Sequence, residues 1–209
     1  AATLRSVRLI LASGNQHKVA EFRRLLAAAA PAVELLSVTD VGARISFDEG
    51  DDSYLSNAMG KATSVYQAVR QPVIADDSGL EVDALGGAPG VLSARYGPPD
   101  ADDAGRAAHL LRNLETQGEV VRTARFVCCI ALVLDERRFL SVQATVEGHI
   151  AERASGTGGF GYDPVFVPES ETLTMAELEG QRKDAISHRG RALRACLRCV
   201  DAATARLLG

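Results

Sequence analysis

The chain has 209 residues, of which 46% are hydrophobic and 24% are charged, so it can bury one sizeable core, and we expect residues 1–209 to form a single domain. Its formal net charge of -4 disfavours a general nucleic-acid or membrane-surface binder, because those partners attract a basic surface. No apolar run approaches the roughly 18 residues that span a bilayer, and no signal-peptide pattern opens the sequence. We therefore expect a cytoplasmic protein without a membrane partner.

Short apolar runs alternate with helical periodicity along the chain. The pattern predicts strands at 7–12 and 72–75, helices at 18–30, 53–69, 100–115 and 188–208, a weaker helical segment at 175–178, a loop at 86–90, and a hairpin of residues 125–134 and 138–147. This alternation of helices and strands favours α/β layers around a mixed sheet.

The first polar segment stands where the first predicted strand gives way to a helix. It consists of Ser13, Gly14, Asn15, Gln16, His17 and Lys18. Free backbone N–H groups and the helix dipole converge there on an anion, so the turn is a candidate phosphate cradle, although its spacing disfavours a P-loop ATPase. Lys18 either reaches a phosphate oxygen or is an ordinary solvated lysine. We favour the first role, because a lysine in a first turn opposes the dipole unless an anion is present.

Two further clusters carry acids, an amide and an amine. Asn57 and Lys61 are four residues apart on one helix face just after Glu49, and they either look into a cleft or form a polar outer face. Asp76 and Asp77 end a buried apolar strand, where two adjacent carboxylates repel each other unless a cation or donors compensate. We expect one of them to face the cleft and the other to hold a turn, and with Glu49 they supply the oxygen ligands that Mg²⁺ prefers. In the alternative, they are simply turn-forming acids.

Residues 155–163 combine four glycines, two aromatics and an acid. A glycine cluster indicates a close approach of the backbone or positive φ angles. Phe160 or Tyr162, on either side of Gly161, can stack on a base, and Asp163 can accept a hydrogen bond from a ring N–H. The alternative is a tight turn between strands whose aromatics cap the core.

The last polar segment consists of Lys183 and the run Ser187, His188 and Arg189. Ser187 can cap the following helix, which leaves His188 and Arg189 at its positive end, where cations need an anionic or electron-rich partner. In this interpretation Lys183 serves a phosphate, and His188 with Arg189 donates to a carbonyl on a base. The alternative is solvated charge flanking a helix.

Six ordered motifs make the chain similar, nearly end to end, to the inosine triphosphate pyrophosphatase family, also called the Ham1 or RdgB-type family. They are residues 13–18, 57–58 with 61–62, 75–80, 85–90 with 93–96, 156–164 and 186–193. The resemblance implies a two-lobed α/β fold on a long mixed sheet, a homodimer and dependence on Mg²⁺. It also implies hydrolysis of the non-standard purine nucleotides dITP, ITP and XTP or dXTP to the monophosphate and pyrophosphate.

The same resemblance implies roles for individual residues. Glu49 and Asp77 correspond to magnesium ligands, Asp77 also to the general base, and residues 13–18 to the phosphate-binding turn. The implied substrate contacts are Ser78, Phe160, Gly161, Tyr162, Asp163, Lys183, His188 and Arg189, to which we add Asn57 and Lys61. Two other classes stay open: a non-catalytic nucleotide sensor, which the Glu49 and Asp77 pair argues against, and a related phosphohydrolase acting on other nucleotides.

Overall fold

The computed structural model describes residues 7–43, 49–50 and 53–208. Within them, six strands form one sheet in the order β2-β1-β3-β4-β5-β6. The strands are β1 (Val7–Leu11), β2 (Val33–Ser37), β3 (Val73–Val82), β4 (Thr123–Val133), β5 (Phe139–Ile150) and β6 (Phe166–Pro168). Strand β1 pairs in parallel with β2 and β3, whereas β5 pairs antiparallel with β6, so the sheet is mixed.

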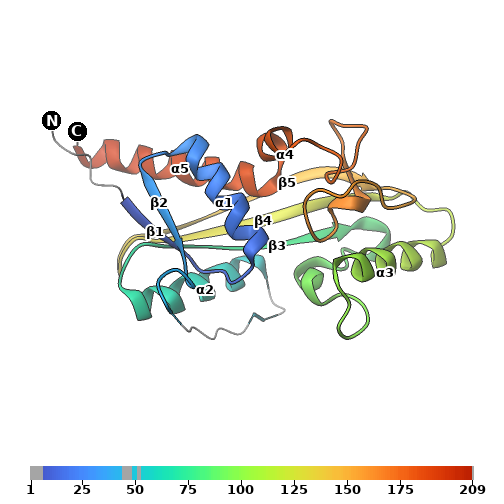
Figure 1. Cartoon of the computed structure of the whole chain (residues 1–209), viewed down its shortest axis with the longest axis horizontal. Coiled ribbons are helices and arrows are strands. Elements are labelled where there is room, and N and C mark those ends of the chain that lie inside the picture. The colour runs from blue at the N-terminus through green and yellow to red at the C-terminus, as the bar shows by residue number, and fades with distance from the viewer. Residues whose placement is uncertain (1–6, 44–48, 51–52, 209) are drawn as a thin grey trace. The chain divides into compact units, whose positions relative to one another are not determined.

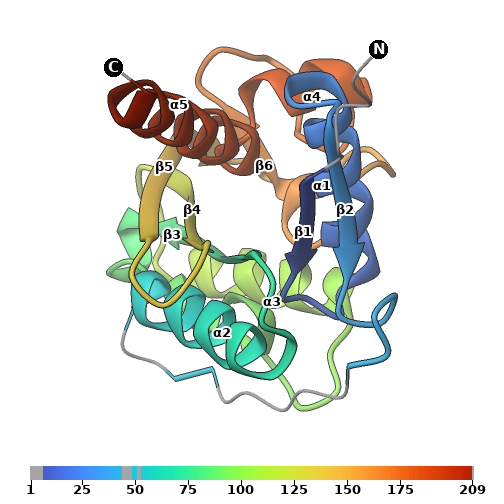
Figure 2. The ribbon, with the colours of Figure 1, turned by 90° about the vertical axis from the view of Figure 1, so that its left-hand side faces the viewer.

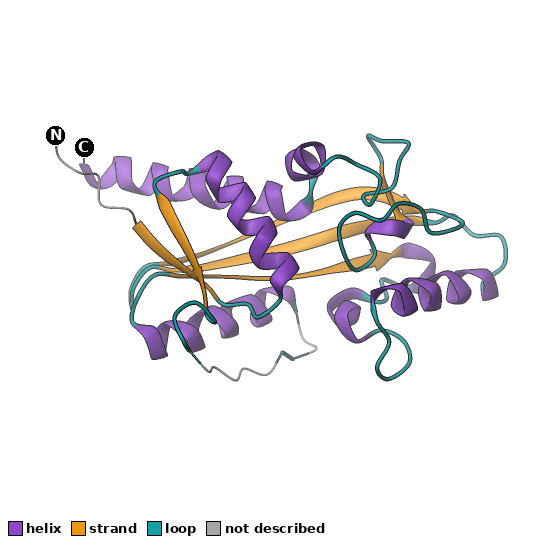
Figure 3. Cartoon of the chain, in the orientation of Figure 1, coloured by secondary structure: helices purple, strands orange, loops and turns teal. Residues whose placement is uncertain are grey.

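Helices accompany the strands, as Figures 1 and 3 show. They are α1 (Gln16–Ala29), α2 (Tyr54–Val69), α3 (Asp103–Thr116), α4 (Gly180–Ile186) and α5 (His188–Leu208), with short 3₁₀ turns η1 (Asp83–Leu85), η2 (Gly90–Arg95) and η3 (Asp163–Val165). The predicted α/β class on a mixed sheet is therefore confirmed. No helix in the described part of the chain is long and apolar enough to cross a membrane.

The chain divides into two compact units. Unit 1 comprises Ala1–Asp77, Cys129–Gln143 and Arg189–Gly209, and unit 2 comprises Ser78–Cys128 and Ala144–His188. Strands β3, β4 and β5 contribute residues to both units, so Asp77 and Ser78, adjacent in β3, belong to different units.

Unit 1 builds its core from α1, α2 and α5 around the strands. Helix α1, which falls in the helical segment predicted at 18–30, buries an apolar stripe of Val19, Phe22, Leu25 and Leu26. Figures 1 and 2 place α2 and α5 on opposite sides of the strands of this unit. Side chains that alternate along β3 therefore reach different helices.

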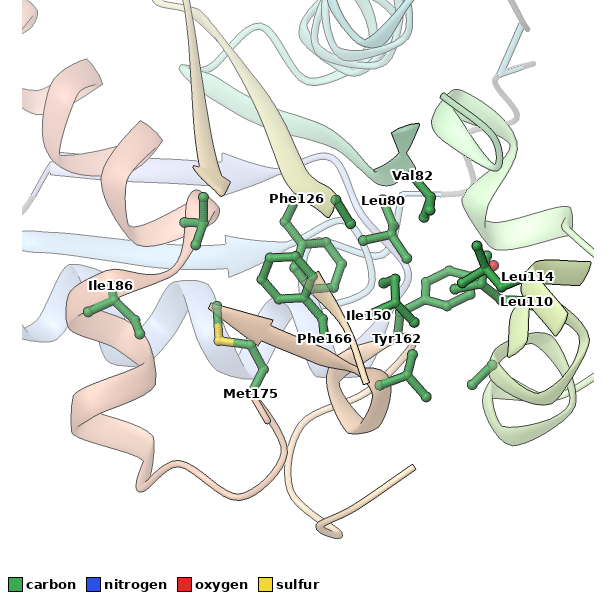
Figure 4. Close-up of a cluster of buried hydrophobic side chains, with 14 residues drawn as sticks. Leu80, Val82, Leu110, Leu114, Phe126, Ile150, Tyr162, Phe166, Met175 and Ile186 are labelled. Atoms are coloured by element: carbon green, nitrogen blue, oxygen red, sulfur yellow. The ribbon is translucent and has the colours of Figure 1, made fainter. Parts of the chain in front are cut away.

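Unit 2 has its own apolar core, which Figure 4 shows. It gathers buried side chains of β3, α3, β4, β5, the loop before η3, η3 itself, β6, the turn at Met175 and α4. The cluster contains Leu80, Val82, Ala107, Leu110, Leu114, Ala124, Phe126, Val146, Ile150, Tyr162, Val165, Phe166, Met175 and Ile186.

Strand β3 corrects one prediction. The sequence suggested a strand that ends before Asp76 and a turn at Ser78, whereas β3 continues to Val82. Leu80 and Val82 are fully buried beyond the acids, so the core extends past them. The carboxylates are tolerated inside a strand because buried cations and an amide compensate them, and the turn-forming alternative is wrong.

Residues 175–178 were also predicted wrongly as helix. They form a turn, in which the Met175 N–H donates to Phe166 O at 2.9 Å and the Met175 side chain enters the core of unit 2. Helix α4 begins only at Gly180. The sequence pattern did not predict α4, β2 or β6. All three elements are short and lack a clear apolar period.

Candidate active site

The predicted phosphate turn joins β1 to α1, and Asn15 is the N-cap of α1. Its Oδ1 accepts the N–H groups of His17 and Lys18 at 2.9 and 3.2 Å, while its own N–H donates to Ser13 Oγ at 3.2 Å. These three amides are used inside the turn, contrary to the expectation that the amides of this turn are free for an anion. Ser13 is half-buried, and Gly14, Asn15, Gln16 and His17 are exposed.

Lys18 belongs to a buried ion network in unit 1. Its Nζ lies 3.0 Å from Asp76 Oδ2, which also accepts from Arg189 Nε and Nη2 at 3.2 and 3.1 Å. Arg189 Nη1 in turn donates to Glu21 Oε2 at 2.7 Å. Asp76, Arg189 and Glu21 are each at most 3% exposed. The alternative of a solvated lysine is therefore wrong for Lys18.

Of the two adjacent acids Asp76 and Asp77, Asp76 is the one that binds cations of α1 and α5. Burial acts to raise its pKa, but Lys18, Arg189 and Lys61 outweigh this effect and hold the pKa well below the usual range of a carboxyl. Asp76 thus stays ionised and connects β3 to α1 and α5 through its two cationic partners.

Asp77 contacts α2 instead. Asn57 Nδ2 donates to Asp77 Oδ2 at 2.8 Å and to Gly50 O at 3.0 Å. Lys61 Nζ donates to Glu49 Oε1 at 2.6 Å and to Asp77 Oδ1 at 3.5 Å. Asn57 and Lys61 are only 5% and 4% exposed, so the alternative of a polar outer face is wrong. The structure brings Glu49, Asn57, Lys61 and Asp77 together in one cluster.

The electrostatics of this cluster favour a proton acceptor. Burial raises the pKa of Asp77, although Lys61 and Asn57 act in the opposite direction. Burial acts to lower the pKa of Lys61, but Asp76, Asp77 and Glu49 raise it overall, so Lys61 remains an ammonium. Asp77 is consequently a stronger base than an exposed carboxylate while it remains beside a fixed positive charge.

The acids of this cluster fit a magnesium ion. Glu49 and Asp77 both contact Lys61 Nζ, so oxygens of both lie within reach of one cation. Two carboxylates completed by water and substrate phosphate are a common way to hold Mg²⁺. No group of three or more His, Cys, Asp or Glu side chains suited to a metal occurs among the described residues, and Asp48, Asp51 and Asp52 lie outside them.

The glycine-rich segment lies in unit 2, where Asp163 organises it. Asp163 Oδ2 accepts the Phe160 N–H at 2.7 Å and Lys183 Nζ at 2.5 Å. The same Nζ lies 5.6 Å from the centroid of the Phe160 ring, a cation–π arrangement. Tyr162 is 4% exposed and its hydroxyl donates to Ser93 O at 2.9 Å. Tyr162 therefore caps the core, whereas the half-buried Phe160 ring lies beside the Lys183 ammonium.

Close backbone approach explains part of the glycine content. A Cβ at Gly156 would lie 2.6 Å from the carbonyl carbon of Ala176, and the Gly158 N–H donates to Ala176 O at 3.0 Å. The segment thus presses on the turn that replaces the predicted helix at 175–178. Glycine at these two positions therefore lets the loop backbone pack closely against the backbone of Ala176.

Gly159 offers a test of how tightly Asp163 and Lys183 are packed. It has φ +73°, and a Cβ there would overlap Asp163 Oδ2 and lie 2.6 Å from Lys183 Nζ. Gly159→Ala should lower the free energy of unfolding by about 2–4 kcal/mol, from backbone strain plus overpacking. Gly161→Ala is the matched control, because Gly161 has φ +63° but an open surrounding, so strain of about 1–2 kcal/mol is expected. Equal losses in urea denaturation would contradict the tight contact.

Lys183, His188 and Arg189 are buried, so the alternative of solvated helix-flanking charge is wrong for all three. The His188 imidazole stacks on the Phe126 ring with centroids 4.7 Å apart and an interplanar angle of 12°. Ser187 is buried and extended immediately before α5, and Ser78 is half-buried in β3.

Three residues that contact the predicted site residues were not predicted from the sequence. Glu21 binds Arg189, Phe126 stacks on His188, and Asp103 accepts a hydrogen bond from Gly161 N–H at 2.7 Å. Glu21 carried one usable signal, because it lies one turn after Lys18 at the edge of the apolar face of α1. Phe126 and Asp103 carried no such signal, since His188 and Gly161 are distant from them in sequence.

These features define an α/β protein in which a buried lysine, Lys61, joins the carboxylates of Glu49 and Asp77 at a candidate cation site. A family model described as the Ham1 family matches residues 9–199. A dITP/XTP pyrophosphatase of Treponema denticola is 47% identical over 188 residues, which cover 90% of this chain and 95% of that relative. A dITP/XTP pyrophosphatase of Bacillus subtilis is 40% identical over 193 residues, with coverage of 92% and 96%.

Solved structures agree with the sequence relatives. A HAM1 protein from Coxiella burnetii is 37% identical with a TM-score of 0.83, covering 94% of this chain and 99% of its own. A dITP/XTP pyrophosphatase of Mycobacterium abscessus is 43% identical with a TM-score of 0.72, covering 91% and 99%. The chain belongs to the Ham1 family.

Proposed function

We propose that this protein hydrolyses the non-standard purine nucleotides dITP, ITP and XTP or dXTP to the monophosphate and pyrophosphate. Family membership supports this activity, as do the similar dITP/XTP pyrophosphatases. The observation that carries the proposal is Asp77, a buried carboxylate with a raised pKa that shares Lys61 with Glu49. A cluster of this kind suits the activation of water beside a polyphosphate.

In this mechanism Asp77 accepts a proton from a water molecule. The water oxygen forms a bond to the α-phosphorus, the bond from that phosphorus to the bridging oxygen of the β-phosphate breaks, and pyrophosphate leaves. Lys61 and Lys18 provide positive charge for the triphosphate, and the turn at residues 13–18 and Asn57 complete the phosphate side. Glu49 and Asp77 would hold Mg²⁺, which neutralises charge on the phosphate oxygens when it is bound.

The residues of unit 2 recognise the base in this proposal. Phe160 stacks on the purine, and Asp163, held by Lys183, accepts a hydrogen bond from a ring N–H. His188 donates to the 6-oxo group, whereas the 6-amino group of ATP is itself a donor and leaves His188 unpaired. Gly161, Tyr162 and Ser78 complete this side of the substrate set.

Arg189 also stays in the proposed substrate set. Its guanidinium is held by Asp76 and Glu21, so it acts on the substrate partly through the ion network that orients Lys18.

The proposal is tested by a substrate panel with product chromatography. We expect dITP, ITP and XTP to give the monophosphate and pyrophosphate with Mg²⁺ present, and ATP to react far more slowly. Release of orthophosphate and a diphosphate would support the related phosphohydrolase instead. Tight binding of dITP without turnover would support the nucleotide sensor.

Metal dependence gives a separate prediction. We expect excess EDTA to abolish turnover and added Mg²⁺ to restore it, because Glu49 and Asp77 are the proposed ligands. The Glu49→Gln variant should require a higher Mg²⁺ concentration for half-maximal rate, while its melting temperature stays close to that of the wild type, since Glu49 is exposed. Turnover that is insensitive to EDTA would contradict this assignment.

We also propose that the protein is a homodimer, as the family resemblance implies. Sedimentation equilibrium should then give twice the chain mass of 22.1 kDa. A mass that stays at one chain across micromolar concentrations would refute it.

A further inference from the structure

The tip of the glycine-rich segment is held from outside the segment. Within it, the Phe160 N–H donates to Asp163 Oδ2, and the Asp163 N–H donates back to Phe160 O at 3.2 Å, so the two residues close a small ring. The N–H of Gly161, between them, points elsewhere and donates to Asp103 Oδ2 at 2.7 Å. Asp103 lies in the first turn of α3, 58 residues earlier in the chain and in the same unit.

The Asp103 carboxylate is oriented by its own helix. Its Oδ1 forms an ion pair with Arg106, one turn further along α3, and Arg106 also donates to Ala101 O. One oxygen is thus held by the helix, and the other accepts from Gly161. Asp102, the preceding residue, is the N-cap and accepts the Gly105 N–H at 2.8 Å. The two adjacent acids therefore have separate tasks, since Asp102 caps the helix and Asp103 reaches the loop.

The hydrogen bond to Gly161 restrains the backbone that carries the Phe160 ring. The N–H of Gly161 belongs to the peptide plane that begins at the Phe160 carbonyl carbon, so holding it fixes the backbone on one side of Phe160. Gly161 has φ +63°, and nothing lies within 4 Å of a Cβ built there, so no packing at that point replaces the hydrogen bond. A hydrogen bond to an ionised acceptor is roughly twice as strong as a neutral one.

We propose that Asp103 is a positioning residue for base recognition, which orients Phe160 and Asp163 by holding the Gly161 amide. This inference rests on the proposed function, because it assumes that Phe160 and Asp163 contact the purine. Asp103 itself touches no substrate. Its loss should weaken the binding of dITP with little effect on the chemistry at Asp77.

The test compares Asp103→Ala and Asp103→Asn with Asp102→Ala as the matched control. Asp103→Ala should raise KM for dITP roughly tenfold, the equivalent of about 1.4 kcal/mol, with kcat within about twofold of wild type. Asp103→Asn retains one acceptor oxygen, so its KM should be intermediate. Asp102→Ala loses a helix cap and should lower Tm without raising KM. An unchanged KM in Asp103→Ala, or an equal rise in Asp102→Ala, would overturn the proposal.

Hydrogen exchange of the Gly161 amide, followed by NMR without nucleotide, gives a readout independent of activity. The amide should exchange slowly in the wild type and in Asp102→Ala. In Asp103→Ala its protection factor should fall at least tenfold. Equal protection in all variants would overturn the hydrogen-bond role. If the wild type failed to hydrolyse dITP, the proposed function would fall, while the exchange data would still report on the contact between Asp103 and Gly161.

Discussion

Asp77→Asn is expected to reduce kcat for dITP by about 10³-fold, within the range of 10²–10⁴ that a general acid or base contributes. The substitution removes a proton acceptor and one of the two proposed magnesium ligands at nearly constant volume. The fold should persist, because an asparagine oxygen can still accept from Asn57, and Lys61 keeps its contact with Glu49 at 2.6 Å. Steady-state kinetics together with the melting temperature of the variant measure both expectations.

Asp135→Asn provides the control for this prediction. Asp135 lies in unit 1, in the turn between β4 and β5, where its carboxylate serves the local residues Arg137 and Arg138. We expect its kcat to match the wild type. Near-normal kcat in Asp77→Asn would refute the assignment of Asp77 as the base.

Arg189→Ala should lower the free energy of unfolding by roughly 3–5 kcal/mol, the usual cost of leaving buried charges without their partner. Arg189 is 2% exposed and binds Asp76 and Glu21, which are equally buried, so both carboxylates lose their shared cation. Asp76 would retain Lys18 at 3.0 Å, whereas Glu21 has no other ion-pair partner among the described residues. Urea denaturation of the variant and the wild type measures the difference.

Arg23→Ala is the matched control, because Arg23 forms an ion pair with Asp40 at 2.6 Å in the same unit with both side chains substantially exposed. Such surface pairs contribute about 0–1 kcal/mol. Arg189→Lys should retain a positive charge but cannot donate to Asp76 and Glu21 at the same time, as a guanidinium does. Its free energy of unfolding should therefore lie between those of the wild type and Arg189→Ala. An unchanged free energy of unfolding in Arg189→Ala, combined with a selective loss of ITP over ATP hydrolysis, would assign Arg189 to the base and not to the network.

The acid pair shows how far the sequence predicts the site. Period-two geometry alone indicated that Asp76 and Asp77 face opposite ways, and the structure agrees. The partners of each acid come from helices that are distant in the sequence. Asp76 binds residues of α1 and α5, and Asp77 binds a residue of α2. The end of the strand was mispredicted because the sequence does not show that these charges are compensated by Lys18, Lys61, Asn57 and Arg189.

The composition and the local periodicity of the chain determined the α/β class, the long helices, the β4–β5 hairpin and the set of candidate residues, because these depend on neighbours within about four positions along the chain. Tertiary structure alone decided that Asn57 and Lys61 are buried, that Tyr162 packs in the core while Phe160 lies beside Lys183, and that Asp103 reaches Gly161. Each of these contacts joins residues that are far apart along the chain, and burial changes both the energy of a charge and its pKa. Neither effect is encoded in the spacing of residues along one segment.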